Sequence, residues 1–341
     1  MMADASPPAR TLKDIARLAG VSPGTVSRAL AGKSVVNAET RQRIEALAAE
    51  HNFQINQMAR RLRAQRTGVI GIAIPLGHER RQRLSDPFFM TLLGHLADEL
   101  AARDHDVMLS RIIPDDDDWL SRITRSGMVD GVVLIGQSDQ LPVIEAVAET
   151  YLPLVVWGST MPGQRHCAVG VDNRLGGRLA GEHLIAGGRR RIAFMGEIRT
   201  LELTQRHAGL CDTMSEAGLP PPHQLDVALA PELMPDQIQA NLARLRDDGV
   251  TIDGIVAASD MIALATMTAL IAGGRSVPGD VAVTGFDDLP LAERAIPRLT
   301  TIRQDLEAGA AAMIAALFAR LDGRAAPGLE MPPRLIVRDS A

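Results

Sequence analysis

Residues 11–30 constrain the fold more than any other part of the chain, because they read as two short helices joined by a tight turn. Apolar residues recur at helical spacing in the first half, which predicts a helix with one buried face. This face consists of Leu12, Ile15, Ala16 and Ala19. Gly20 follows, and glycine most readily adopts the positive φ with which many helices end.

A second helix is predicted directly after this turn. Ser22 offers a hydroxyl N-cap, and Pro23 stands at the first helical position, where its missing N–H costs nothing. The buried side of the helix consists of Val26, Ala29 and Leu30. Arg28 points outward. The pattern predicts a helix-turn-helix whose second helix suits a DNA major groove, although helical bundles that never meet DNA contain the same geometry.

The charge of the chain favours the DNA-binding interpretation. Residues 1–66 hold eleven Lys and Arg against five Asp and Glu, so this segment carries +6. The whole chain carries −5, so residues 67–341 carry −11. A basic head on an acidic body is typical of a phosphate-facing module attached to a part that avoids nucleic acid.

The rest of the head predicts a third helix and a linker. Residues 38–50 form the helix, with Ile44 and Leu47 on its inner face, and the helix-turn-helix domain spans residues 11–55. Residues 1–10 are expected to be disordered. Residues 56–66 read as a short hinge helix: Asn56 caps it, Ala59 allows close approach, Arg60 is one of several arginines, and Leu62 is an apolar wedge. Such a wedge among arginines suits minor-groove insertion, and an ordinary solvated linker is the alternative.

The head resembles that of the lactose-repressor (LacI/GalR) family. The shared pattern is T-L-x-D-I-A-x-x-A-G-V-S-x-x-T-V-S-R-x-L, followed by N-x-x-A-R-x-L-R-x-x-x-T-x-x-I-G. Similarity continues through the body and covers nearly the whole chain after the first ten residues. The residues expected to contact DNA are Thr11, Ser22, Pro23, Gly24, Thr25, Ser27, Arg28, Asn56, Ala59, Arg60 and Leu62.

The second helix departs from the family at its first two positions. Family members often place base-reading side chains there, whereas this chain has Pro23 and Gly24, whose side chains cannot form hydrogen bonds. Arg28 can still make a bidentate contact to guanine. We therefore expect Arg28 to carry direct base reading, with groove shape or a thymine methyl read at the other two positions.

The body, residues 67–341, is long enough for two lobes and rich enough in apolar residues for real cores. No apolar run approaches the length of a membrane helix, and no signal peptide precedes the basic head. Cys167 and Cys211 lie far apart without ligand-type spacing, so we expect no metal site and a reducing, cytoplasmic location.

Short β-rich runs alternate with amphipathic helical stretches along the body, which predicts parallel sheets with right-handed crossovers. The runs expected to form strands are Val69–Ile74, Val107–Leu109, Gly131–Ile135, Leu154–Trp157, Arg191–Met195, Gly254–Ala257 and Val281–Gly285. Two series, divided near Gly170–Asp172, predict an α/β fold with two doubly wound lobes. The family resemblance implies three crossings between the lobes, as in periplasmic sugar-binding proteins. It assigns about 67–170 and 297–325 to lobe 1, and about 171–296 and 330–341 to lobe 2.

Ligands of open parallel sheets bind beyond the carboxyl ends of the strands, so residues at strand exits are candidate ligand contacts. By resemblance, Asp287 accepts hydrogen bonds from effector hydroxyls and Arg206 donates into the pocket. Ser259 stands where the family often has asparagine. The predicted effector-binding residues are Phe88, Phe89, Gln137, Trp157, Arg206, Ser259 and Asp287. Because sugars have apolar faces and hydroxylated rims, Trp157 beside Asp287 and Arg206 suits a sugar ring.

Other readings of these positions stay open. Trp157 is equally interpretable as an aromatic side chain that closes the core at the sheet edge. Asp260 is expected to cap the helix that follows it rather than to contact ligand. His166 beside Cys167 suggests a metal site only weakly, because the pair has no further ligands nearby in the sequence.

The motifs of common enzyme classes are missing from the sequence: G-x-G-x-x-G after the first strand, the P-loop, G-x-S-x-G and H-E-x-x-H. We expect no enzyme activity and no cofactor. A sugar-binding protein needs no helix-turn-helix, and an architectural DNA-binding protein needs no two-lobed body.

The sequence predicts a homodimeric regulator that binds double-stranded operator DNA and no membrane. A tetramer is the alternative oligomeric state. Because release by a sugar is the commoner arrangement in the family that the chain resembles, we expect a repressor of carbohydrate-utilisation genes that a mono- or disaccharide releases from its operator. The alternative is a regulator whose corepressor is a non-sugar ligand such as a purine.

Overall fold

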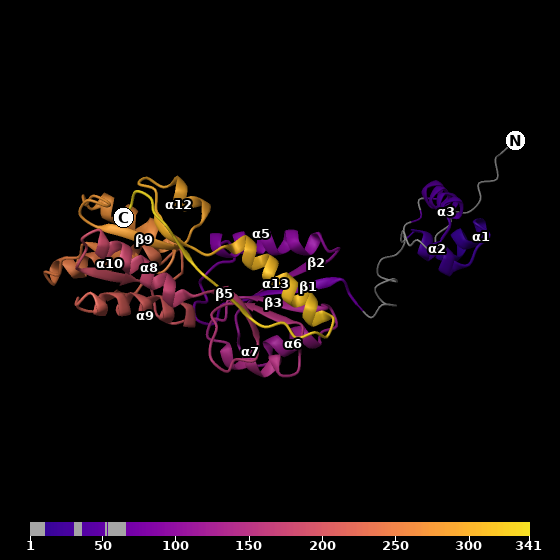
Figure 1. Ribbon diagram of the computed structural model, residues 1–341, viewed down its shortest axis with the longest axis horizontal. Helices are drawn as coiled ribbons and strands as arrows, with labels where there is room; N and C mark the ends of the chain where they lie inside the picture. The colour runs from indigo at the N-terminus through magenta and orange to yellow at the C-terminus, as the bar shows by residue number, and fades with distance from the viewer. Residues whose placement is uncertain (1–10, 31–35, 52, 54–65) are drawn as a thin grey trace. The chain divides into compact units, whose positions relative to one another are not determined.

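The computed structural model describes residues 11–30, 36–51, 53 and 66–341, and it divides into two compact units, residues 1–67 and 68–341 (Figure 1). The predicted disordered segment 1–10 and most of the predicted hinge 56–66 lie outside the described residues, so those two predictions stay predictions.

The first unit contains the three predicted helices: α1 (Leu12–Leu18), α2 (Pro23–Leu30) and α3 (Ala38–Glu50). Its core includes Ile15, Val26 and Ile44, one from each helix. Each helix has a local start signal. Thr11 and Asp14 form a capping box on α1, the Ser22 hydroxyl accepts the Thr25 N–H at 3.1 Å, and Asn37 caps α3. Gly20 has a φ of +63° after α1, as predicted.

The second unit contains two six-stranded sheets. The strands of each lobe follow the same spatial order in both sheets. The first sheet runs β11 (Leu329–Met331), β5 (Cys167–Val171), β4 (Leu154–Trp157), β3 (Gly131–Ile135), β1 (Val69–Pro75), β2 (Asp106–Ile112). The second runs β12 (Arg334–Ile336), β10 (Thr300–Arg303), β9 (Ala282–Asp287), β8 (Gly254–Ala257), β6 (Ile192–Met195), β7 (His223–Leu225). All pairings are parallel except β10 with β12. The predicted pair of doubly wound lobes is confirmed.

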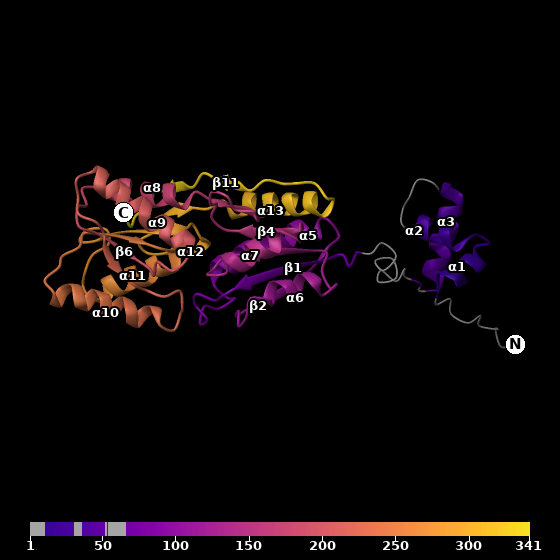
Figure 2. The same cartoon turned by 90° about the horizontal axis from the view of Figure 1, so that it is seen from below.

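Both faces of the first sheet are covered by helices (Figures 1 and 2). The helices α5 (Pro87–Ala101) and α13 (Leu306–Leu321) cover one face, and α6 (Trp119–Arg125) and α7 (Leu141–Ala148) cover the other. Along β3, Val133 and Ile135 face the α5–α13 layer whereas Val132 and Leu134 face the α6–α7 layer, as the two-residue period of a strand requires.

The second sheet is covered in the same way. In Figure 2, α8 (Asn173–Ala186) and α9 (Leu201–Glu216) lie on one side, and α10 (Met234–Asp247) and α11 (Asp260–Ala272) lie on the other. The short helix α12 (Pro290–Arg294) follows β9. None of the helices in the described ranges is both long and apolar enough to cross a membrane.

The chain crosses between the lobes three times, but two of the predicted boundaries are wrong. The segment assigned to lobe 1 from residue 297 begins with β10, which pairs with β9 through Thr300 opposite Thr284 and so belongs to lobe 2. Its buried run Thr300–Ile302 completes the second sheet before the chain returns to lobe 1 as α13. Similarly, Met331 belongs to β11, which pairs with β5 in lobe 1, and the last crossing comes after it.

Candidate effector cleft and DNA-facing helix

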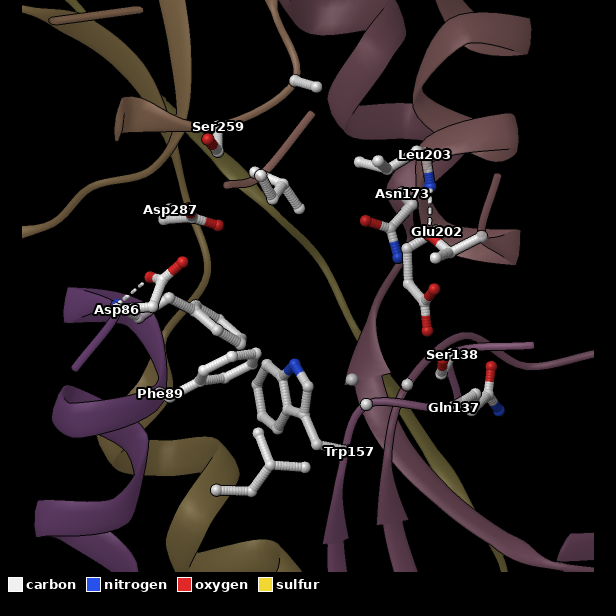
Figure 3. A pocket seen from close by; sticks show the side chains of 18 of the residues that line it. Asp86, Phe89, Gln137, Ser138, Trp157, Asn173, Glu202, Leu203, Ser259 and Asp287 are labelled. Atoms are coloured by element: carbon white, nitrogen blue, oxygen red, sulfur yellow. Dashed lines mark hydrogen bonds between the residues drawn. The ribbon is translucent and has the colours of Figure 1, made fainter. Parts of the chain in front are cut away.

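A cleft lies at the carboxyl ends of the strands of both lobes and leaves about 840 Å³ of empty space, part of it open to solvent. All seven predicted effector residues line it. Figure 3 labels five of them: Phe89, Gln137, Trp157, Ser259 and Asp287. Phe88, Phe89, Gln137 and Trp157 come from lobe 1, and Arg206, Ser259 and Asp287 come from lobe 2. The topology produces this convergence, because parallel strands end at one edge of each sheet.

The lobe 1 side of the cleft has an aromatic floor, which we define as Trp157, Phe88 and Phe89. The N-cap Asp86 places the two phenylalanines in the first turn of α5, and Trp157 is the last residue of β4. The ring centroids of Phe88 and Trp157 lie 6.4 Å apart, and those of Phe88 and Phe89 lie 5.8 Å apart. Trp157 is only 4% exposed and packs against α13 at Gly309, so it is a core residue as well as a lining residue.

Arg206 is a buried cation on α9 with fixed partners. Its Nε donates to Asn173 Oδ1 at 2.8 Å, its Nη1 donates to the Ala258 carbonyl at 2.6 Å, and its guanidinium lies 3.6 Å from the centre of the Phe286 ring. Burial lowers the pKa of Arg206, and the nearby Asp287 carboxylate opposes this shift. These contacts hold the guanidinium in place before any ligand arrives.

Asp287 ends β9 with a φ of +122°, a conformation that few non-glycine residues adopt. Its Oδ1 accepts a hydrogen bond from Gln304 Nε2 at 2.6 Å. Burial raises the pKa of Asp287 to about 7, although the Arg206 guanidinium and the Gln304 hydrogen bond act in the opposite direction. The strained backbone directs a carboxyl group to the cleft, where ligand hydroxyls can donate to it.

Gln137 is oriented by a buried hydrogen-bond chain. Its Nε2 donates to the Ser159 carbonyl and to His166 Nε2, both at 2.9 Å. His166 Nε2 is therefore an acceptor, and the Nδ1–H of this ring donates to the Glu145 carboxylate. These partners account for His166, and within the described ranges no group of three or more His, Cys, Asp or Glu side chains could hold a metal ion.

The start of α11 differs from the prediction. Ser259, not Asp260, is the N-cap: its backbone is extended and its hydroxyl accepts the Ile262 N–H at 3.3 Å. Asp260 is fully buried and accepts hydrogen bonds from the Leu289 N–H and the Thr301 hydroxyl instead. Burial and the neighbouring Asp287 charge raise the pKa of Asp260. Asp260 therefore supports the loop that follows β9 and does not line the cleft.

Sequence reasoning missed several polar residues of the cleft. They include Gln82, Asp86, Asn173, Glu202 and Gln304. Asp86 and Asn173 follow the same rule of strand exits and helix starts that identified Ser259, so the sequence carried a signal for them. Glu202 and Gln304 lie on α9 and on a crossover segment, and only the folded chain brings them to the cleft.

The first unit presents an exposed helix start at α2. Ser22, Pro23, Gly24 and Arg28 are exposed, and Thr25 and Ser27 are half-buried. The Arg28 guanidinium lies over Gly24, with Nη1 3.6 Å from the position where a Cβ would stand. A Cβ at Gly24 would therefore make only an ordinary van der Waals contact with Arg28. Thr11 is exposed at the start of α1, whereas Asn56, Ala59, Arg60 and Leu62 lie outside the described residues.

Two family models match the chain: "Bacterial regulatory proteins, lacI family" over residues 11–56, and "Periplasmic binding protein-like domain" over residues 182–341. Among curated proteins, the HTH-type transcriptional regulator CelR of Thermobifida fusca is 31% identical over 339 residues, which covers 97% of this chain and 98% of the relative. A ribose operon repressor of Halalkalibacterium halodurans is 28% identical over 336 residues, which covers 97% of this chain and 96% of the relative.

Solved structures agree with these matches. A complex of the transcriptional regulator CelR with cellobiose superimposes with a TM-score of 0.70 at 29% identity and covers 98% of this chain and 100% of the relative. The Lac repressor dimer bound to operator and the anti-inducer ONPF shares the fold, with a TM-score of 0.83 at 24% identity over 98% of this chain and 99% of that one. By its full-length identity to CelR and the match of its first unit, the chain belongs to the LacI family of DNA-binding transcriptional regulators.

Proposed function

We propose that this regulator is a repressor of carbohydrate-utilisation genes and that a mono- or disaccharide in the cleft releases it from its operator. The observation that carries the proposal is the pairing of an aromatic floor with a polar rim. Trp157 and Phe88 offer apolar surface to the C–H face of a sugar ring, while Asp287 and Arg206 offer an acceptor and a donor to its hydroxyls. The sugar-bound relative CelR supports this proposal.

The proposed mechanism couples the cleft to DNA through lobe closure. A ligand that touches both lobes favours whichever arrangement of the lobes binds it more tightly. In a homodimer, a shift of the first lobes would change the spacing of the two heads and therefore the fit to a palindromic operator. We propose a dimer because one recognition helix reads only a few base pairs.

A thermal-shift screen of the full chain tests the effector. The probes are monosaccharides, disaccharides and purines, and each hit is then added to a gel-shift assay with operator DNA recovered by in vitro selection. We expect at least one neutral sugar to raise the melting temperature and to weaken operator binding. A purine that stabilises the chain and strengthens operator binding, with no sugar active, would establish the corepressor alternative instead.

The DNA side is tested with Arg28→Ala. Loss of one bidentate contact to guanine should lower discrimination at one operator position by roughly 1–3 kcal/mol. Arg17→Ala serves as the matched control, since it removes an exposed arginine from the last turn of α1, outside the predicted DNA contacts. If both variants change operator affinity equally at every base position, Arg28 contributes only phosphate attraction.

A further inference from the structure

The ionisable side chains that line the cleft are unbalanced in charge. Asp86, Glu202 and Asp287 bring three carboxyl groups, whereas Arg206 brings one guanidinium, part of which is already engaged with Asn173 and Ala258. His78 also lines the cleft, and burial lowers the pKa of its ring, which favours the neutral form. Burial also raises the pKa of Asp86 and that of Asp287, the latter to about 7, so an anionic ligand would further disfavour their charged forms. The lining thus sets three carboxyl groups against one guanidinium.

The carboxyl groups stand on opposite sides of the aromatic floor. Figure 3 shows Asp86 and Asp287 on one side of Trp157 and Glu202, from α9, on the other. A sugar ring seated on Trp157 would thus meet a carboxyl group along either rim. A negative substituent directed to either of these rims would lie near a carboxyl group.

Three buried acceptor atoms of the cleft lining lack a hydrogen-bond partner, whereas no buried donor atom of the described lining residues does. Among the described residues, Gln82 Oε1, Gln137 Oε1 and Glu202 Oε1 are buried and have no hydrogen-bond partner. The Gln137 amide nitrogen donates to Ser159 and is hydrogen-bonded to His166, and the Gln82 amide nitrogen donates to Asp86. Rotating either amide by 180° would therefore break a hydrogen bond. Buried acceptors of this kind need donors, and hydroxyl groups supply them.

We infer that the cleft selects uncharged, hydroxyl-rich sugars and excludes phosphorylated and acidic sugars, with Glu202 as a specificity-determining residue. The inference rests on the proposed carbohydrate function. A phosphate or carboxylate brings acceptors only, so it satisfies none of the free acceptor atoms and adds charge beside Asp86, Asp287 or Glu202. A hydroxyl at the same place donates to them at no cost in charge.

Isothermal titration calorimetry of the full chain with matched sugars tests the selection. The series comprises glucose, glucose 6-phosphate and glucuronate; galactose and galacturonate; and ribose and ribose 5-phosphate. We expect a neutral member to bind and its anionic partners to bind at least about tenfold more weakly. An anionic member that binds as tightly as its neutral partner overturns the inference while the carbohydrate function stands. If no sugar binds, neither these members nor the disaccharides of the thermal-shift screen, the carbohydrate function on which the inference rests is overturned.

A pair of isosteric variants tests the role of Glu202. Glu202→Gln removes one negative charge from the cleft and should raise the affinity for the anionic sugar relative to the neutral one about tenfold. Glu216→Gln is the matched control, because Glu216 lies about 21 Å further along the same helix and is paired with Arg178 outside the cleft. The control should leave the ratio of affinities unchanged. Equal ratios in both variants and the unmodified chain would show that Glu202 does not set the specificity.

Discussion

The two lobes of the body share a sheet order, yet they bring different sets of side chains to the cleft. Lobe 1 contributes the aromatic floor, whose central residue, Trp157, belongs to the lobe 1 core. Lobe 2 contributes Arg206, Glu202 and Asp287, and the first and last of these are buried. Lobe 1 therefore contributes the aromatic surface together with polar groups such as Asp86 and Gln137, whereas lobe 2 contributes the guanidinium and two of the three carboxyl groups.

This difference explains why a ligand would need both lobes. The aromatic floor alone can contact the apolar face of a sugar but cannot recognise the positions of its hydroxyl groups. The charged residues of lobe 2 alone can bind hydroxyl groups but offer no aromatic surface for that apolar face. A sugar satisfies the two surfaces at once, so its binding free energy depends on how the lobes are arranged. That dependence is the property a ligand-controlled switch requires.

The largest expected effect comes from the packing that places Arg206. A Cβ on Gly177 of α8 would lie 1.9 Å from the Arg206 carbonyl, so Gly177→Ala must push α8 and α9 apart. We expect a loss of about 3 kcal/mol in the free energy of unfolding, measured by urea denaturation, and loss of sugar binding.

Gly94→Ala on α5 of lobe 1 is the matched control. Nothing lies within 4 Å of a Cβ at Gly94. The substitution should therefore raise the free energy of unfolding by about 0.5–1 kcal/mol, through the higher helix propensity of alanine alone. If Gly177→Ala proves as harmless as Gly94→Ala, close packing of α8 on α9 does not position the polar side of the cleft.

These two glycines also show where sequence reasoning reaches its limit. The strand runs and strand exits follow from local patterns, and they predicted that Gln137, Trp157, Ser259 and Asp287 line one cleft, as they do. Phe88, Phe89 and Arg206 were predicted from the family resemblance, and they line the same cleft. The local sequence does not tell that Gly177 is closely packed and that Gly94 is not. That difference depends on the distance between two helices, which the tertiary fold sets. The same holds for Glu202 and Gln304, and for β10, whose short buried run is assigned to lobe 2 only by its pairing with β9.

The two tryptophans allow the aromatic floor to be separated from the core. Trp157→Leu should lower the free energy of unfolding by about 2 kcal/mol and weaken sugar binding about tenfold, because it removes the stacking surface. Trp119 is equally buried in lobe 1 but donates to Gln140 and does not line the cleft. Trp119→Leu should therefore cost similar stability and leave affinity unchanged. Calorimetry would contradict the division of roles if both variants lost affinity equally.

Asp287 links the polar side of lobe 2 to pH. Its pKa is about 7 in the folded chain and near 3.9 in the unfolded chain, so between these values the folded state holds a proton that the unfolded state has released. The free energy of unfolding therefore falls as pH rises from about 4 to about 7 and stays level above. Asp287→Asn removes this slope. The difference in the free energy of unfolding between the variant and the unmodified chain should shift in favour of the variant by roughly 2 kcal/mol from pH 5 to pH 8. The affinity of the variant for sugar should fall.

Asp288 is the neighbouring control, because it is paired with Arg303 and Arg338. Asp288→Asn breaks those pairs and should lower the free energy of unfolding at both pH values. Urea denaturation at pH 5 and pH 8 distinguishes the two carboxyl groups. A slope that persists in Asp287→Asn would place the titrating proton elsewhere, with Asp260 as the next candidate.

The smallest effect is expected at Ser259, where a helix cap and a cleft contact share one side chain. Ser259→Ala should cost about 1 kcal/mol by urea denaturation, because the Ile262 N–H loses its acceptor. Asparagine caps helices as well as serine does, so Ser259→Asn should change stability by less than about 0.5 kcal/mol. Its longer amide also brings a donor to a cleft rich in acceptors, and sugar affinity should rise a few-fold. If Ser259→Asn keeps the stability of the unmodified chain but gains no affinity, the polar side of lobe 2 already meets its ligand fully without this position.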